Sequence, residues 1–262
     1  MLSNLNIYMQ ERAININSFN RQKIGRSRPE DYTIKFDPVM HLDTEMRHEL
    51  AVDRVTMTYS WHNINAEYGN NQIKYTKNNG STWKTINFVD GMYSYDDISE
   101  YIIGVVTQNG DQPSNNQVGV KIYFVLSSYR VVVELGNDWQ LDIRNSTFSD
   151  LIGFEPKIIT KTEYSTKLPN ITNSIDTIHI NCDVVTDSIT DGKFSNTLAI
   201  IPTDNLTRSY PFTFEPKRAL FSPVSKTMIS EMRITLTDSI GRSIDLNGID
   251  WHMSLILRSS FI

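Results

Sequence analysis

Cysteine, histidine and long apolar runs are all scarce in this chain of 262 residues. Cys182 is the only cysteine, which excludes an internal disulfide and favours a reducing compartment. No stretch approaches the roughly 20 consecutive apolar residues of a membrane helix, so we expect no membrane span. The start of the chain lacks a basic segment followed by an apolar core, so we also expect no signal peptide.

The charge balance limits the possible partners. The formal net charge is −5 at pH 7, which argues against a molecule that binds nucleic acid over its whole surface. A hydrophobic content of 39% is typical of a soluble globular protein. The length is sufficient for one large β domain or two small ones, each with its own core.

Motifs for catalysis and metal binding are missing. There is no HExxH, GxSxG, Walker or GxGxxG pattern, and no two of the five histidines have a metal-ligand spacing. His41 and His48 flank Asp43, Glu45 and Glu49, a group that could in principle collect a metal, but a solvated charged loop explains this segment equally well. Asp96 or Asp97 could form a carboxylate pair for acid–base chemistry with Asp142, but no sequence signal brings them together. Asp96 is better explained at a helix N-terminus. We therefore predict no enzyme activity, no catalytic residue, no metal and no cofactor.

The stretch 175–185, IDTIHINCDVV, is the clearest strand. Its apolar and polar residues alternate, so one face is buried and the other is exposed to solvent. The apolar row contains Cys182, which indicates a packed thiol rather than a catalytic one. The apolar row is Ile178, Ile180, Cys182 and Val184, and the polar row is Thr177, His179, Asn181 and Asp183.

Short alternating segments recur along the rest of the chain, with turn signals between them. We count roughly seven strands on each side of a polar connector, which predicts antiparallel sandwiches of the jelly-roll type. One helix is expected, capped by Ser94 or Asp96 and ending near Asn109 and Gly110. The piece STFSDLIGF, residues 146–154, predicts one or two further helical turns that end at Gly153.

These patterns predict an all-β chain of two tandem antiparallel β-sandwiches of jelly-roll type, with one short helix in the first. The polar connector and the restart of alternation at Ile175 mark the boundary. The expected organisation is an N-terminal arm at 1–30, a first β-sandwich at 31–160, a connector at 161–172 and a second β-sandwich at 173–262.

The N-terminal arm is a candidate for contacts between subunits. Its apolar residues show no complete core-facing pattern, and a small basic cluster follows them. A neighbouring subunit could supply the missing apolar surface and an acidic partner surface, and nucleic acid is the alternative partner for the basic cluster. A solvated tail explains the same features. The candidate interface residues are Ile7, Tyr8, Ile14, Ile16, Phe19, Arg21, Lys23, Arg26 and Arg28.

Several segments of the chain carry a family resemblance. They are PNITNSIDTIHINCDVV (169–185), the YPF…EP segment (210–216) and TD..GR.IDLNG.D (237–250), with YSYDDISEYI (93–102) and LIGF (151–154) before them. Together they resemble the jelly-roll capsid proteins of Polinton/Maverick-like and adintovirus-like elements and of related large DNA viruses. The resemblance covers about two-thirds of the chain, mainly after Asp90.

The resemblance implies a virion structural protein that forms a homo-oligomer of cyclic symmetry together with other capsid proteins. It implies synthesis in the host cytoplasm or nucleus and a place in the virion. The chain lacks the length and tall loops of a double-jelly-roll shell protein, which favours a penton-like or minor (cement) component. The alternative is a β-sandwich module that binds a glycan or a cell receptor, with Tyr129 and Tyr210 as candidate stacking residues.

Overall fold

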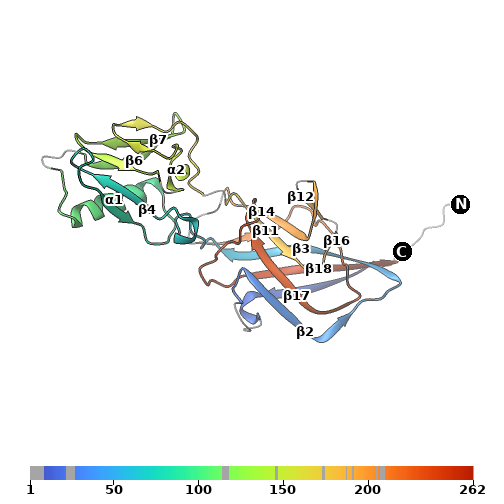
Figure 1. Ribbon diagram of the computed structural model, residues 1–262. Helices are drawn as coiled ribbons and strands as arrows, with labels where there is room; N and C mark the ends of the chain where they lie inside the picture. Colours follow the sequence, from blue (N-terminus) through green and yellow to red (C-terminus); the bar gives the residue numbers. More distant parts are fainter. Residues whose placement is uncertain are drawn as a thin grey trace. The chain divides into compact units, whose positions relative to one another are not determined.

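The computed structural model forms two compact units (Figure 1). The first, here the jelly-roll unit, comprises Met1–Trp61 together with Ile175–Ile262, and the second, here the inserted unit, is His62–Ser174. The residues described are 9–21, 27–113, 118–144, 147–172, 175–186, 188–190, 192–204, 206 and 210–261. The predicted all-β class, with antiparallel sheets and a short helix, is confirmed.

The jelly-roll unit has eight main strands in two four-stranded layers. The first sheet has the order β1 (Met9–Asn17), β18 (His252–Phe261), β3 (Met46–Thr58) and β15 (Pro211–Phe214), and β16 (Ser222–Pro223) also pairs with β3. The second sheet has the order β14 (Thr197–Pro202), β11 (Thr177–Cys182), β17 (Met228–Thr237) and β2 (Asp31–His41). A small hairpin of β12 (Ser188–Thr190) and β13 (Lys193–Ser195) lies between β11 and β14 in the chain. Two layers of four antiparallel strands in this order form a jelly roll.

The core of this unit is built from the inward rows of the strands. In β11, Ile178, Ile180 and Cys182 are fully buried, as the alternating pattern predicts. The central strands β17 and β18 bury their alternate residues in the same way. Burying one such side chain contributes about 1.5–3 kcal/mol relative to an exposed one. The inward rows of β17 and β18 are Met232, Ile234 and Leu236, and Met253, Leu255 and Leu257.

The inserted unit is a smaller sandwich with its own core. One sheet has the order β10 (Glu163–Tyr164), β7 (Arg130–Leu135) and β6 (Val120–Val125), and the other has the order β5 (Lys84–Asn87), β4 (Gln72–Thr76), β8 (Gln140–Asp142) and β9 (Ile158–Ile159). Its helical elements are η2 (Ala66–Tyr68), α1 (Tyr95–Gln108) and α2 (Phe148–Leu151). Within the described ranges, no helix is long and apolar enough to cross a membrane.

Helix α1 begins and ends where the sequence predicts. The Ser94 hydroxyl accepts a hydrogen bond from the Asp97 amide, and the Asp97 carboxylate accepts one from the Ser94 amide. This capping box satisfies two amides that the first turn leaves without partners. Gly110 follows the helix with φ +68°, a left-handed conformation that glycine adopts without strain. The buried face of α1 packs against β6, where the Ile122 amide donates to the Ser99 hydroxyl.

The expected domain boundaries need correction, because the two units are not in tandem. Residues 31–61, assigned to the first sandwich, fold with 175–262: β2 pairs with β17, and β3 pairs with β18. The expected connector at 161–172 contains β10, which pairs with β7 of the inserted unit. Alternation along a strand reports which face is buried but not which strand lies beside it, so pairing over such distances leaves no local signal. The restart at Ile175 does coincide with a boundary between units.

The expected arm at 1–30 also needs correction over its described part. β1 pairs with β18 along nine residues, and the short helix η1 (Ser18–Asn20) follows it. The Ser18 amide donates to the Trp251 carbonyl at 3.0 Å, and the Trp251 amide donates to the Ser18 hydroxyl at 2.9 Å. The Trp251 indole N–H donates to the Pro29 carbonyl at 2.8 Å. Residues 9–17 of the expected arm therefore belong to the first sheet, beside the chain's own last strand.

Trp251→Phe tests the hydrogen bond from the Trp251 indole to the Pro29 carbonyl. The change removes the indole N–H and leaves the buried Pro29 carbonyl without that donor, while an aromatic ring remains beside Tyr32. We expect a loss of about 1–3 kcal/mol in the free energy of unfolding, measured by chemical denaturation. Trp83→Phe, at a half-buried position of the inserted unit, is the matched control. Equal stability of the two variants would contradict the structural role of this hydrogen bond.

A buried carboxylate organises one end of the inserted unit. Asp111 is 4% exposed and lies 2.7 Å from the Lys77 ammonium and 2.6 Å from that of Lys84. The Tyr75 hydroxyl also donates to it at 2.7 Å. Burial alone raises the pKa of Asp111, but the hydrogen bonds from Lys77, Lys84 and Tyr75 outweigh burial and hold this pKa well below its usual range. The charged carboxylate therefore stabilises the folded unit.

Asp111→Asn should destabilise the inserted unit at neutral pH by about 1–3 kcal/mol, at the lower end because both lysines are partly exposed. Since the folded pKa is lowered, the contribution is complete above the ordinary value of 3.8 and is lost as the pH falls below it. Hydrogen exchange of α1 in the full chain at pH 7 and at pH 3 measures both effects. Glu100→Gln, an exposed carboxylate of α1, should change little. A pH-independent difference between Asp111→Asn and wild type would contradict this assignment.

Candidate assembly surface

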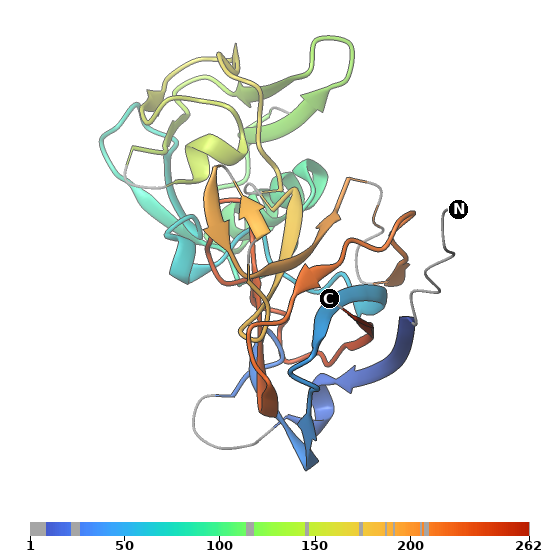
Figure 2. The same cartoon turned by 90° about the vertical axis from the view of Figure 1, so that its right-hand side faces the viewer.

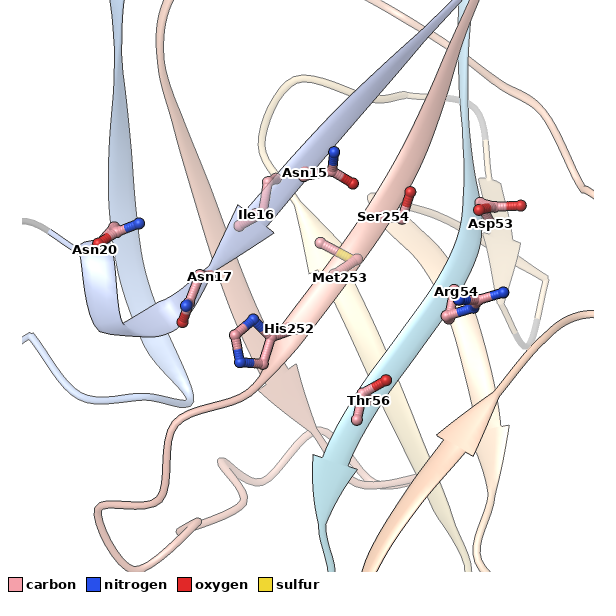
Figure 3. Close-up of a pocket in the computed structure, with 10 residues that line it drawn as sticks. All are labelled: Asn15, Ile16, Asn17, Asn20, Asp53, Arg54, Thr56, His252, Met253 and Ser254. Atoms are coloured by element: carbon pink, nitrogen blue, oxygen red, sulfur yellow. The ribbon is translucent and has the colours of Figure 1, made fainter.

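An open polar groove of about 550 Å³ lies on the outward face of the first sheet. Two cross-strand rows form it, because residues opposite each other in an antiparallel ladder project to the same face. One row is Asn15, Ser254 and Arg54, and the next is Asn17, His252 and Thr56. Figure 3 shows these side chains along β1, β18 and β3, with Asn20 of η1 beside them.

A β-bulge in β3 shapes the side of the groove that this strand forms. Ser254 pairs with Arg54 while Leu255 pairs with Val52, so Asp53 is an extra residue in β3. Asp53 and Arg54 are consecutive residues, yet both are exposed. A bulge re-aims side chains in this way and bends the strand. The guanidinium of Arg54 is held 2.7 Å from the Glu215 carboxylate, which follows β15.

The second row continues onto β15, the fourth strand of the sheet, and remains polar. Thr213 of β15 is opposite Thr56, and their hydroxyls lie 3.4 Å apart. The groove thus combines amides, hydroxyls, one imidazole and one guanidinium on a rigid strand framework. These groups suit hydrogen bonding to another polar surface. Among the residues that the structure describes, no three His, Cys, Asp or Glu side chains are grouped as metal ligands would be.

In the acidic segment around His41 and His48, the side chains of His48 and Glu49 make hydrogen bonds and ion pairs within the fold. The His48 ring nitrogens lie 2.8 Å from the Ser259 hydroxyl and 2.8 Å from the Asp43 carbonyl oxygen. Glu49 is bound by Arg258 and by Arg47. Asp142 receives the Arg144 guanidinium, whose hydrogen bond lowers the pKa of Asp142. These contacts already occupy the ring nitrogens of His48 and the carboxylates of Glu49 and Asp142.

The single thiol is a core residue. Cys182 is fully buried, and burial raises its pKa to about 12. Roughly one thiol in ten thousand is then ionised at pH 8, and only the thiolate is nucleophilic.

We expect native Cys182 to react with iodoacetamide at least about 100-fold more slowly than an exposed thiol, because it is buried and because so little of it is ionised. Ser128→Cys provides that thiol in the same chain, because Ser128 is exposed in the turn between β6 and β7. Mass spectrometry of the alkylated peptides gives both rates from one sample. Comparable rates at the two positions would show that Cys182 is accessible and activated.

The five candidate interface residues within the described ranges have different surroundings. Ile16 is 3% exposed in the jelly-roll core, and Ile14 is half-buried. Arg21 forms an ion pair with Asp250, and Arg28 lies 3.9 Å from the buried Glu30. Phe19 is 60% exposed. Ile7, Tyr8, Lys23 and Arg26 lie outside the described residues.

For Ile16 and Arg21 the structure gives partners in the same chain. Both partners, Met253 across the ladder and Asp250, come from the last strand or the turn before it. Alternation within one segment identifies an outward row but not the row that lies beside it. The groove requires the pairing of β1, β18 and β3, which are far apart in sequence.

The fold has similar solved structures, although no protein-family model and no curated protein matches the chain. The mavirus penton protein superposes with a TM-score of 0.52 at 11% identity, over 95% of this chain and 100% of that one. A chain of the Sputnik virophage structure superposes with a TM-score of 0.46 at 9% identity, over 97% and 98% of the two chains. At this identity the first match supports the predicted resemblance to jelly-roll capsid proteins at the level of the fold.

Proposed function

We propose that this chain is a non-enzymatic structural protein of a virion, a penton-like or minor capsid component that assembles into a cyclic oligomer. The observation that carries the proposal is the complete jelly roll built from both ends of the chain around an inserted unit. A penton protein shares this fold over its full length. Other capsid proteins are the expected partners. The narrower resemblance to Polinton/Maverick-like and adintovirus-like elements stays a prediction.

The surface of the jelly-roll unit suits assembly. One polar row on the outward face of the first sheet, Asn17, His252, Thr56 and Thr213, crosses all four strands and offers hydrogen-bonding groups to a neighbour. Fixed strands hold these groups, so binding a neighbour costs little ordering entropy. The groove over β1, β18 and β3 is therefore our candidate for a contact within the shell.

His252→Trp tests the groove as a contact. The larger side chain fills the centre of the groove but points outward, so folding should be unaffected. We expect association to weaken by at least about tenfold, since each lost polar contact changes the binding free energy by about 1 kcal/mol or more. Sedimentation velocity gives the association constant, and negative-stain micrographs after co-expression with neighbouring genes show incorporation into particles.

Lys35→Trp is the matched control, an equally large change at an exposed position of β2 in the other sheet. Loss of assembly in both variants would point to a general effect of tryptophan. Normal assembly of His252→Trp would remove the groove from the interface. If the wild-type chain remains monomeric at all concentrations and never enters particles, the proposed function is wrong.

The alternative function is recognition of a glycan or receptor. Two exposed tyrosines favour it: Tyr129 is 62% exposed in the β6–β7 turn with φ +51°, and Tyr210 is 65% exposed before β15. A non-glycine residue in the left-handed region is uncommon and marks a site worth testing. A monomeric chain that binds a glycan array, and loses binding on Tyr129→Ala or Tyr210→Ala, would support recognition over assembly.

A further inference from the structure

The free edge of β1 differs from the other edges of the jelly roll. The two sheets end in β1 and β15, and in β14 and β2. Three of these four described strands contain proline: Pro211 in β15, Pro202 in β14 and Pro38 in β2. Proline has no N–H to donate, and natural edge strands use it to prevent another strand from adding. β1 has nine residues and no proline.

The phase of the β1–β18 ladder identifies the free backbone groups. The Ser18 amide donates to the Trp251 carbonyl, so this pair is one in which the backbone groups point toward β18. Hydrogen-bonded and non-hydrogen-bonded pairs alternate along an antiparallel ladder. The N–H and C=O groups of residues 9, 11, 13, 15 and 17 therefore point away from β18, toward the open edge. Figure 2 shows β1 as the dark blue strand at the margin of its unit.

The side chains of β1 leave this edge accessible. Residues 9–13 are exposed on both faces of the strand. Glu11 and Arg12 are the two charged residues of β1 and have opposite signs, so together they add no net charge to the edge. Ala13 lies at the centre with a small side chain. Among the described strands only β18 pairs with β1, so its other edge offers a row of free backbone groups and has none of the prolines of the other three edge strands.

We propose that this edge binds residues 1–8 of a second copy of the chain, which adds a strand to the first sheet. Such strand addition gives affinity through backbone hydrogen bonds. Eight extended residues span up to about 27 Å, close to the length of β1. The segment, MLSNLNIY, also contains Ile7 and Tyr8 of the predicted interface set. The inference rests on the proposed assembly function and names one contact that would hold neighbouring subunits together.

Binding to the same copy is disfavoured by the position of the segment. β1 pairs with β18 from its first residue, Met9, so a return onto its own free edge needs a tight turn just before it. Two-residue hairpin turns require residues such as Gly or Asn-Gly at positive φ. The sequence around the turn, NIYMQ at 6–10, has no glycine and no Asn-Gly pair. A second copy meets no such restriction.

Ala13→Pro and Ala13→Val test the edge as a matched pair. The Ala13 N–H points to the open edge, so proline removes that donor without breaking a hydrogen bond to β18. Valine also enlarges the side chain but keeps the N–H. We expect Ala13→Pro and deletion of residues 1–8 each to weaken self-association at least about tenfold, while Ala13→Val associates like wild type. Equal association of Ala13→Pro and Ala13→Val would overturn the proposal.

A mixing experiment distinguishes binding between copies from binding within one. The only native thiol is buried, so engineered cysteines dominate the reaction with a short bismaleimide. Ile7→Cys and Ala13→Cys are placed in separate chains, with the latter carrying a tag of different mass. A crosslinked heterodimer that links peptides containing positions 7 and 13 is the expected result. A crosslink formed only when both cysteines are in one chain would refute binding between copies.

The outcomes separate this proposal from the proposed function. If Ala13→Pro and the deletion assemble into particles as well as wild type does, the β1 contact is wrong and the capsid role stands. If the wild-type chain shows neither oligomers nor particles, both are wrong. Circular dichroism of Ala13→Pro verifies the fold, and the deletion variant gives an independent measurement if proline disturbs β1.

Discussion

The antiparallel pairing of the last strand with two early strands holds the jelly-roll unit together. β18 lies between β1 and β3 and pairs with nine residues of the first and ten of the second. Its inward residues Met253, Leu255 and Leu257 are almost fully buried. Without β18, β1 would lose its strand partner and the core would lose a complete row. Contacts of such long sequence separation are expected to slow folding.

This constraint explains how the chain accommodates the inserted unit. The jelly roll is closed by its ends, so the segment between β3 and β11 is free to carry a second unit with a separate core. Trp61 and Ile175, the residues of the jelly-roll unit at its two borders with the inserted unit, are both buried. The inserted unit has its own buried carboxylate, Asp111, which forms ion pairs with Lys77 and Lys84.

The surfaces available for assembly follow from the same sheet. Placing β1 beside β18 creates the polar groove and also leaves β1 as an edge strand. The groove offers side chains on the face of the sheet, whereas the edge offers backbone groups. These two kinds of contact have different requirements: the first depends on the identities of Asn15, His252 and Arg54, and the second on the absence of proline in β1. One strand pairing therefore positions both candidate contacts.

The sequence determined much of the local structure. Alternation in 175–185 predicts the buried row of β11, and the Ser94 cap with the apolar spacing after it predicts α1, because side-chain periodicity depends only on the residue's own strand or helix. It also determined that Cys182 is a packed thiol. The tertiary structure decided the partners: that β2 and β3 join β17 and β18 across the inserted unit, that Arg21 and Ile16 are used within the chain, and that the outward residues of three strands form one groove. Strand pairing is a relation between distant segments that backbone groups common to all residues make, so no single segment records it.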